Sequence, residues 1–336
     1  MNILIPSYEP DERLLLLIKQ LRATGSFPIV VVDDGSGEAY SGLFRSVREL
    51  GCTVITHSIN KGKGHALKSG FHYFMQIGTT DGIVCADSDG QHLPQDIMKI
   101  ASSIQEHSQH IILGSRRFTG KVPFRSRFGN AATRLVYSLT TGKRIYDTQT
   151  GLRGYSADML DWLCSIPGER FEYEMNLLLE APVAGFSFHE VTIDTVYLDH
   201  NESSHFRPIV DSARIYAPLF KFSMTSVLSA VIDFLLLALI HFFSSSLLLA
   251  VLGARLTSSS FNYTMNKRFV FAKGKRSAIQ TSMPKYFALV IVIFSLNYGL
   301  MFVFNERLGV PLLIAKLCTE ASLFLFSYWA QRRFVY

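Results

Sequence analysis

Two clusters of carboxylates each follow a short apolar run: Asp33 and Asp34 follow one, and Asp87 and Asp89 follow the other. A β-branched run that ends in carboxylates and glycine is typical of a buried parallel strand. In open α/β sheets, ligands bind at the carboxyl ends of the strands. An Asp-x-Asp segment there offers two oxygen ligands to one Mg²⁺ or Mn²⁺, and that ion can hold a diphosphate. The pattern therefore predicts binding of a nucleotide-diphosphate compound.

The elements that would position these carboxylates alternate along the first 200 residues. Helical patterns cover residues 12–21 and 65–75, between apolar runs that read as strands. The expected strands are 2–6, 28–33, 53–57, 82–87 and 110–113. Alternation of this kind predicts an α/β fold with a mostly parallel, Rossmann-like sheet flanked by helices.

The last third of the chain has a different composition. Four apolar segments, at about 222–243, 247–265, 286–304 and 311–329, each approach the ~20 residues needed to cross a bilayer. We therefore expect a soluble domain over 1–207, an amphipathic juxtamembrane helix over 208–221 and an all-α, four-helix transmembrane domain over 222–336.

Basic residues set the expected orientation of these spans. They gather between the second and third segments and after the fourth, at Lys267, Arg268, Lys273, Lys275, Arg276, Lys285, Arg332 and Arg333. The positive-inside rule places these segments, residues 1–220 and the C-terminus in the cytoplasm, as in a multi-pass protein of the cell membrane. The net charge of +6 then reflects topology and contact with anionic lipid, and no nucleic-acid partner is expected.

Four ionisable residues lie inside the expected spans, and their charges sum to zero. They are Asp233, Arg255, Lys316 and Glu320. Groups at such depth pair with one another or line a polar path, and the sequence leaves both alternatives open. The segment 262–271 also resembles 327–336 at an offset of 65 residues, so the membrane domain reads as a duplicated pair of helices.

Four motifs in a fixed order are more specific than any one of them. They are Pro6-Ser7-Tyr8-Glu9, Val32-Asp33-Asp34-Gly35-Ser36, Asn60-Lys61-Gly62-Lys63-Gly64 and Asp87-Ser88-Asp89-Gly90-Gln91-His92. On these motifs, residues 1–210 resemble the inverting family 2 glycosyltransferases, which have a GT-A fold. Within that family they look most like dolichol-phosphate mannose synthases and bacterial polyprenyl-phosphate glucosyltransferases. The membrane half resembles the GtrA-like four-helix module, whose copies end like the segment 268–271.

The resemblance implies a donor and metal site. By position, the metal ligands are Asp87, Asp89 and Gln91, with Ser88 where alanine is frequent in the family. The residues that would bind the nucleotide sugar are Pro6, Tyr8, Glu9, Asp33, Asp34, Lys63, Asp87, Ser88 and Asp89. Lys63 would meet the base or the diphosphate, and a solvated loop lysine is the alternative.

Arginines downstream are expected to bind the acceptor phosphate, because a guanidinium fork matches phosphate oxygens. The resemblance favours Arg117 and Arg127, with Arg116 as a competitor and surface charge as the alternative. His205 and Arg207 take the place of the basic loop over the donor, where the mannose synthases have arginine and lysine. A segment at 147–151 would shape the sugar and acceptor site.

A polyprenyl phosphate needs no general base, since it is already largely anionic near neutral pH. Catalysis then rests on positioning and charge, with Asp89, Arg117 and Arg127 as the catalytic residues. We expect transfer of a monosaccharide, first of all glucose from UDP-glucose, to polyprenyl (undecaprenyl) phosphate at the cytoplasmic membrane face, for cell-envelope polysaccharide. GDP-mannose and UDP-N-acetylhexosamine are alternative donors, and a lipid-linked sugar translocase is an alternative of another class. The oligomeric state is open, with a homo-oligomer as one alternative.

Overall fold

The computed structural model describes residues 1–116, 130–131, 133–134, 137–138, 141–194, 208–271 and 279–335. The chain forms two compact units, Met1–Ile215 and Tyr216–Tyr336.

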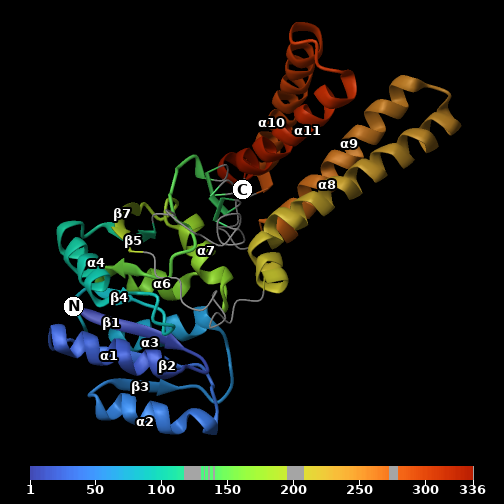
Figure 1. Ribbon diagram of the computed structural model, residues 1–336. Coiled ribbons are helices and arrows are strands. Elements are labelled where there is room, and N and C mark those ends of the chain that lie inside the picture. The colour runs from blue at the N-terminus through green and yellow to red at the C-terminus, as the bar shows by residue number, and fades with distance from the viewer. Residues whose placement is uncertain are drawn as a thin grey trace. The chain divides into compact units, whose positions relative to one another are not determined.

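A seven-stranded sheet forms the centre of the first unit (Figure 1). Its order is β3 (Thr53–Thr56), β2 (Ile29–Asp33), β1 (Asn2–Ser7), β4 (Ile83–Cys85), β6 (Arg153–Tyr155), β5 (His110–Arg116) and β7 (Ser187–Ile193). All pairings are parallel except the two made by β6. The predicted mostly parallel α/β sheet and its five expected strands are confirmed, and β6 and β7 are additional.

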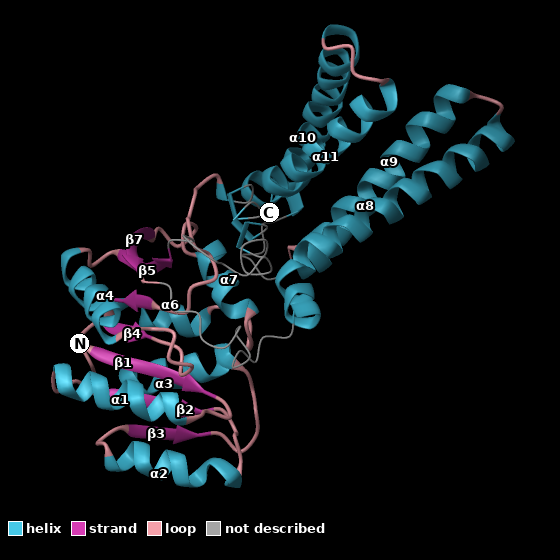
Figure 2. Cartoon of the chain, viewed as in Figure 1, coloured by secondary structure: helices cyan, strands magenta, loops and turns pink. Residues whose placement is uncertain are grey.

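Helices cover both faces of this sheet (Figure 2). One face carries α1 (Glu12–Thr24), α2 (Ser41–Glu49) and α4 (Pro94–Glu106). The other carries α3 (Lys63–Gln76), α6 (Leu160–Ser165) and α7 (Glu172–Glu180). Short 3₁₀ turns at Glu38–Tyr40 and Ala157–Met159 precede α2 and α6. Because both faces are buried, β1 and β2 can be apolar at every position rather than at alternate ones.

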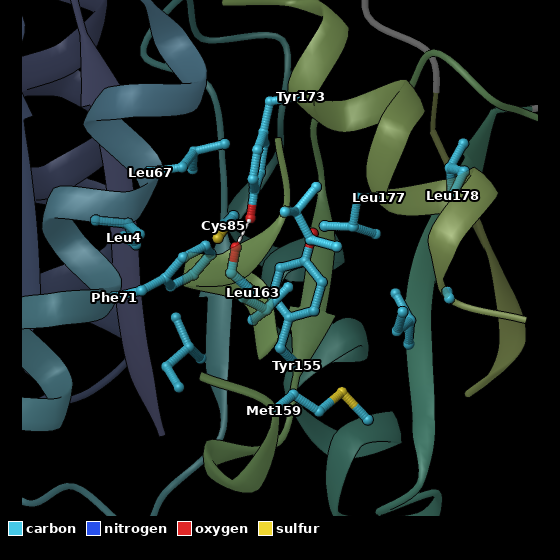
Figure 3. Close-up of a cluster of buried hydrophobic side chains, with 14 of the residues drawn as sticks. Leu4, Leu67, Phe71, Cys85, Tyr155, Met159, Leu163, Tyr173, Leu177 and Leu178 are labelled. Atoms are coloured by element: carbon cyan, nitrogen blue, oxygen red, sulfur yellow. Dashed lines mark hydrogen bonds between the residues drawn. The ribbon is translucent and has the colours of Figure 1, made fainter. Parts of the chain in front are cut away.

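The core beside α3 explains how this helix reaches the sheet. Figure 3 shows Leu4 of β1, Phe71 of α3 and Tyr155 of β6 in this cluster. The Tyr173 hydroxyl, also buried there, donates a hydrogen bond to the Leu163 carbonyl (3.0 Å). A Cβ at Gly70 would lie 2.2 Å from Leu4 Cδ1, so glycine is what permits α3 to pack this close to β1. The helix in turn presents its first residue, Lys63, at the carboxyl edge of the sheet.

The second unit is built of helices joined by short turns among its described residues. Its helices are α8 (Pro208–Ser244), which begins in the first unit, α9 (Leu247–Met265), α10 (Ile279–Met301) and α11 (Leu312–Ala330). Short π-helical segments follow three of them, at Asn266–Val270, Phe302–Arg307 and Gln331–Val335. Two stretches of the described residues, Phe220–Ser244 and Ile279–Arg307, are long and apolar enough to cross a membrane by length and composition. The predicted segments 208–221 and 222–243 form one continuous helix, α8.

The charged residues inside these helices are paired. An Arg255 guanidinium nitrogen lies 3.5 Å from Asp233 Oδ2, and Lys316 Nζ lies 2.6 Å from Glu320 Oε1. The sequence repeat also has a spatial counterpart, because Asn266 Nδ2 donates to Gln331 Oε1 (3.0 Å) from a position 65 residues away. Of the two alternatives left open by the sequence, the structure shows pairing.

Candidate active site

Both acidic clusters lie at the same edge of the sheet, on either side of β1. Asp33 ends β2 in register with Ser7, the last residue of β1, and the Asp34 backbone N–H donates to the Ser7 carbonyl (2.8 Å). On the other side, β4 pairs with β1 and leads into Asp87 two residues after its end. Parallel pairing therefore brings together carboxylates that are 54 positions apart in sequence.

Asp87 is fixed by groups on two sides. Its backbone N–H donates to His92 Nδ1 (3.0 Å), and its carboxylate Oδ1 lies 2.7 Å from Lys63 Nζ. Burial favours the neutral carboxyl, but Lys63, His92 and Arg116 together outweigh this effect and lower the pKa of Asp87 to about 2. Burial lowers the pKa of His92, in keeping with a neutral ring that accepts a hydrogen bond. Asp87 is therefore an ionised carboxylate in a defined orientation.

Asp89 stands in a different environment. Its Oδ1 accepts a hydrogen bond from the Gln91 backbone N–H (3.0 Å), across a turn in which Gly90 has φ +78°. Burial and then the negative charge of Asp87 raise the pKa of Asp89 above its ordinary value. Two half-buried carboxylates that repel one another favour a shared cation.

The donor set suits a hard divalent cation that completes its coordination from a ligand. Within the described ranges, no group of three or more His, Cys, Asp and Glu side chains is arranged to hold a metal ion. Mg²⁺ is typically held by one or two carboxylates together with substrate phosphates. The backbone of Gly151 packs directly against the Asp87 carboxylate. A Cβ at this position would lie 2.1 Å from Asp87 Oδ2, so the absence of a side chain makes room for Asp87. Asp87 and Asp89 thus fit a metal that is bound together with a diphosphate.

Asp34 binds the neighbouring loop rather than pointing to an open site. It is 2% exposed, and its carboxylate accepts hydrogen bonds from the backbone N–H groups of Lys61 (3.0 Å) and Gly62 (2.6 Å). His57 Nδ1 lies 2.8 Å from the same carboxylate. In this way Asp34 fixes the segment from which α3 begins, and with it the position of Lys63.

Asp33 and the segment after β1 are linked through Ser36. The Ser36 backbone N–H donates to Asp33 Oδ1 (2.9 Å), and the Ser36 hydroxyl accepts from the Glu9 backbone N–H (2.9 Å). Glu9 is exposed and has φ +47°, a conformation that is uncommon for a residue other than glycine. Pro6 is buried and Tyr8 is half-buried beside it along the chain. Hydrogen bonds through Ser36 therefore connect the two segments that carry the expected base-binding residues, one after β1 and one at the end of β2.

Arg116 is bound to Asp147 by both arms of its guanidinium group. Nε donates to Asp147 Oδ2 (2.6 Å), Nη2 donates to Oδ1 (3.1 Å), and the Arg116 backbone N–H also reaches Oδ2 (3.2 Å). Asp147 is fully buried. This pair joins the end of β5 to the segment 147–151, which includes Gly151 beside Asp87. Arg117, Arg127, His205 and Arg207 lie outside the described residues, so their assignment to the acceptor phosphate stays a prediction.

Two residues that the sequence did not single out complete the site. Glu174 of α7 has its Oε2 3.0 Å from Lys63 Nζ, on the side opposite Asp87. Arg153 of β6 is 1% exposed, and its Nε lies 3.9 Å from Glu174 Oε1. Burial alone would lower the pKa of Lys63, but Asp87 and then Glu174 reverse the effect and raise it. The acidic spacing in 172–174 resembles an ordinary helix start, which explains why no motif marked Glu174.

Comparison with known proteins gives two family matches that divide the chain. Residues 2–161 match the glycosyl transferase family 2 model, and residues 221–336 match the GtrA/DPMS transmembrane domain. A UDP-N-acetylglucosamine–dolichyl-phosphate N-acetylglucosaminyltransferase of Methanococcus voltae is 27% identical over 221 residues, covering 59% of this chain and 86% of that protein. The glycosyltransferase AglJ of Haloferax volcanii is 24% identical over 231 residues, covering 67% and 72%.

Among solved structures, glucosyl-3-phosphoglycerate synthase from Mycobacterium tuberculosis, in complex with Mn²⁺, UDP and phosphoglyceric acid, aligns with a TM-score of 0.49. The identity is 15%, over 66% of this chain and 75% of that one. The family matches agree with the two kinds of unit seen in the fold, an α/β unit and a helical unit with apolar helices. The chain joins a family 2 glycosyltransferase domain, matched over residues 2–161, to a GtrA/DPMS transmembrane domain, matched over residues 221–336.

Proposed function

We propose that this transferase moves a monosaccharide from a nucleotide diphosphate sugar to a polyprenyl phosphate, with inversion at the anomeric carbon. The observation that carries the proposal is the pair Asp87 and Asp89 at the sheet edge beside Asp33, in a chain that also has a transmembrane domain. The name of the Methanococcus voltae relative supports a lipid phosphate as acceptor. The reaction would take place at the cytoplasmic face, where the basic segments are expected.

The residues have separate tasks in this reaction. Asp33 would bind the ribose or base, and Asp87 and Asp89 would hold Mg²⁺ or Mn²⁺ with the donor diphosphate. When bound, the metal neutralises the charge that develops on the leaving nucleotide diphosphate. Without the metal, the Lys63 ammonium lies beside Asp87 and balances its charge. The acceptor phosphate is the nucleophile, and Arg117 and Arg127 would offset its charge so that two anions can approach.

For the donor, we propose UDP-glucose first, with UDP-N-acetylglucosamine as the second candidate because the named relative uses it. GDP-mannose is the third. The test is a set of three assays, each with the purified full chain, undecaprenyl phosphate, Mn²⁺ and one radiolabelled donor. We expect one donor to give chloroform-soluble label at a rate well above the other two. If none gives a lipid product while the protein binds UDP, a translocase role for the membrane domain would replace the synthase proposal.

A further inference from the structure

Glu174 and Lys63 form a largely buried ion pair next to Asp87, one of the two carboxylates proposed to bind the metal. Lys63 Nζ lies between Asp87 Oδ1 (2.7 Å) and Glu174 Oε2 (3.0 Å), and the Lys63 and Glu174 side chains are only 16% and 15% exposed. The ammonium therefore has two anionic partners at almost equal distance. One of them, Asp87, is also a proposed metal ligand, whereas Glu174 is not.

Arg153 keeps Glu174 in place on the far side. Its Nη1 donates to the Glu174 backbone carbonyl (3.0 Å), and its Nε donates to the Thr150 carbonyl (2.9 Å) while lying 3.9 Å from Glu174 Oε1. Asp87, Lys63, Glu174 and Arg153 thus form a row of alternating charges. Arg153 is buried and bonded to the backbone, so it holds the backbone of Glu174 in place and adds a positive charge on the side of the Glu174 carboxylate away from Lys63.

A divalent cation at Asp87 would add positive charge at one end of this row, next to the Lys63 ammonium. The Lys63 ammonium and the metal would compete for the same carboxylate and would repel one another in a poorly solvated place, where charge interactions are strong. To move off Asp87, the ammonium needs a second anion, and Glu174 Oε2 lies within hydrogen-bond distance of it (3.0 Å). Without Glu174, Lys63 would remain on Asp87 and oppose the metal.

We propose that Glu174 is a positioning residue that holds the Lys63 ammonium away from Asp87 when a divalent cation binds, and so sets the affinity of the site for that cation. Lys63 competes with the metal, and Glu174 relieves the competition. This inference rests on the proposed metal-dependent function, and it adds a residue on α7 that no motif assigns. It predicts effects of opposite sign for the two partners of one ion pair.

The experiment measures Mn²⁺ binding to the purified full chain through the EPR signal of the free ion, with no donor or acceptor present. Lys63→Met removes the competitor and should tighten Mn²⁺ binding about tenfold, whereas Glu174→Gln should weaken it about tenfold. Lys61→Met, at an exposed lysine, and Glu180→Gln, at the half-buried last residue of α7, are the matched controls and should bind Mn²⁺ like the parent. Circular dichroism and thermal melting verify that each variant is folded.

The double variant, with both Lys63→Met and Glu174→Gln, distinguishes an effect of Glu174 through Lys63 from a direct attraction between Glu174 and the metal. If Glu174 acts through Lys63, Glu174→Gln should have little further effect once Lys63 is methionine. An equal weakening in both backgrounds, or a weakening of binding by Lys63→Met in a folded protein, would overturn the inference. A parent chain that binds no Mn²⁺, either alone or with UDP added, would instead contradict the metal site of the proposed function.

Discussion

Individual carboxylates of the site differ in what they bind, although the sequence presents them as similar pairs. Asp34 accepts hydrogen bonds from the backbone of residues 61 and 62, whereas Asp87 contacts the Lys63 ammonium and Asp89 accepts a hydrogen bond from the Gln91 backbone. Residue type and spacing were enough to predict that these groups meet at one sheet edge. The Lys63 to Glu174 contact could not be predicted, because it joins residues 111 positions apart through the packing of α7 on α3.

Arg116 illustrates the same limit for a cation. The sequence offers it for an acceptor phosphate, but the structure places its guanidinium group on the buried Asp147. Asp147 becomes visible as the partner of Arg116 only in the structure, where the end of β5 lies beside the segment 147–151. The assignment of Arg116 to the acceptor stays a prediction that must compete with this pair.

The pair gives a stability prediction for Arg116→Lys. An ammonium cannot reproduce the two-armed contact with Asp147, so we expect a loss of about 1–2 kcal/mol. For a domain of this size, that corresponds to a fall in melting temperature of roughly 4 °C. Thermal unfolding of the purified chain measures it. Arg48→Lys, at an exposed arginine, is the control, and equal melting temperatures for the two variants would contradict the role given to the pair.

Among the elements, the five strands of the predicted set were found, whereas β6 and β7 were not predicted. The runs in β1 and β2 are continuous because both faces of these strands are buried. β6 has only three residues, one of them the buried Arg153, and β7 at the edge of the sheet breaks the alternation of polar and apolar side chains at His189 and Glu190. Such segments carry no periodic signal strong enough to distinguish a strand from a loop.

The segment before β6 gives a prediction at this scale. Gly151→Ala would place a methyl group 2.1 Å from Asp87 Oδ2, so Asp87 or the segment must shift. We expect a folded protein whose rate of sugar transfer falls at least about tenfold, because an ångström of misplacement in such a site is costly. Initial rates with labelled donor measure this. Gly42→Ala on α2, where the methyl group meets nothing within 4 Å, should keep the parent rate. Equal rates for both variants would show that Asp87 needs no such space.

For the whole molecule, the sequence predicted two units of different physical character, and the contacts divide the described chain near residue 215. The repeat in the membrane half was visible in the sequence, and the bond between Asn266 and Gln331 shows equivalent positions in contact. The number of spans and their direction depend on the bilayer, so they remain predictions.

Membrane topology is tested by accessibility in intact cells. With four spans and cytoplasmic termini, a cysteine at Ser244→Cys should react with a membrane-impermeant maleimide from outside. A cysteine at Ser277→Cys, in the basic segment, should react only after permeabilisation. Both are made in a background with Cys318→Ser, since Cys318 is the exposed thiol among the described residues. Labelling of both positions from the same side would contradict the proposed topology.

The most direct test of the central claim is sugar transfer to undecaprenyl phosphate by the parent, by Asp89→Ala and by Asp161→Ala, an exposed carboxylate on α6. The account predicts a metal-dependent, chloroform-soluble product from the parent and from Asp161→Ala, and a rate at least about a hundredfold lower for Asp89→Ala. Full transfer by Asp89→Ala, or transfer by the parent that EDTA does not reduce, would contradict a metal-dependent transferase built on these carboxylates.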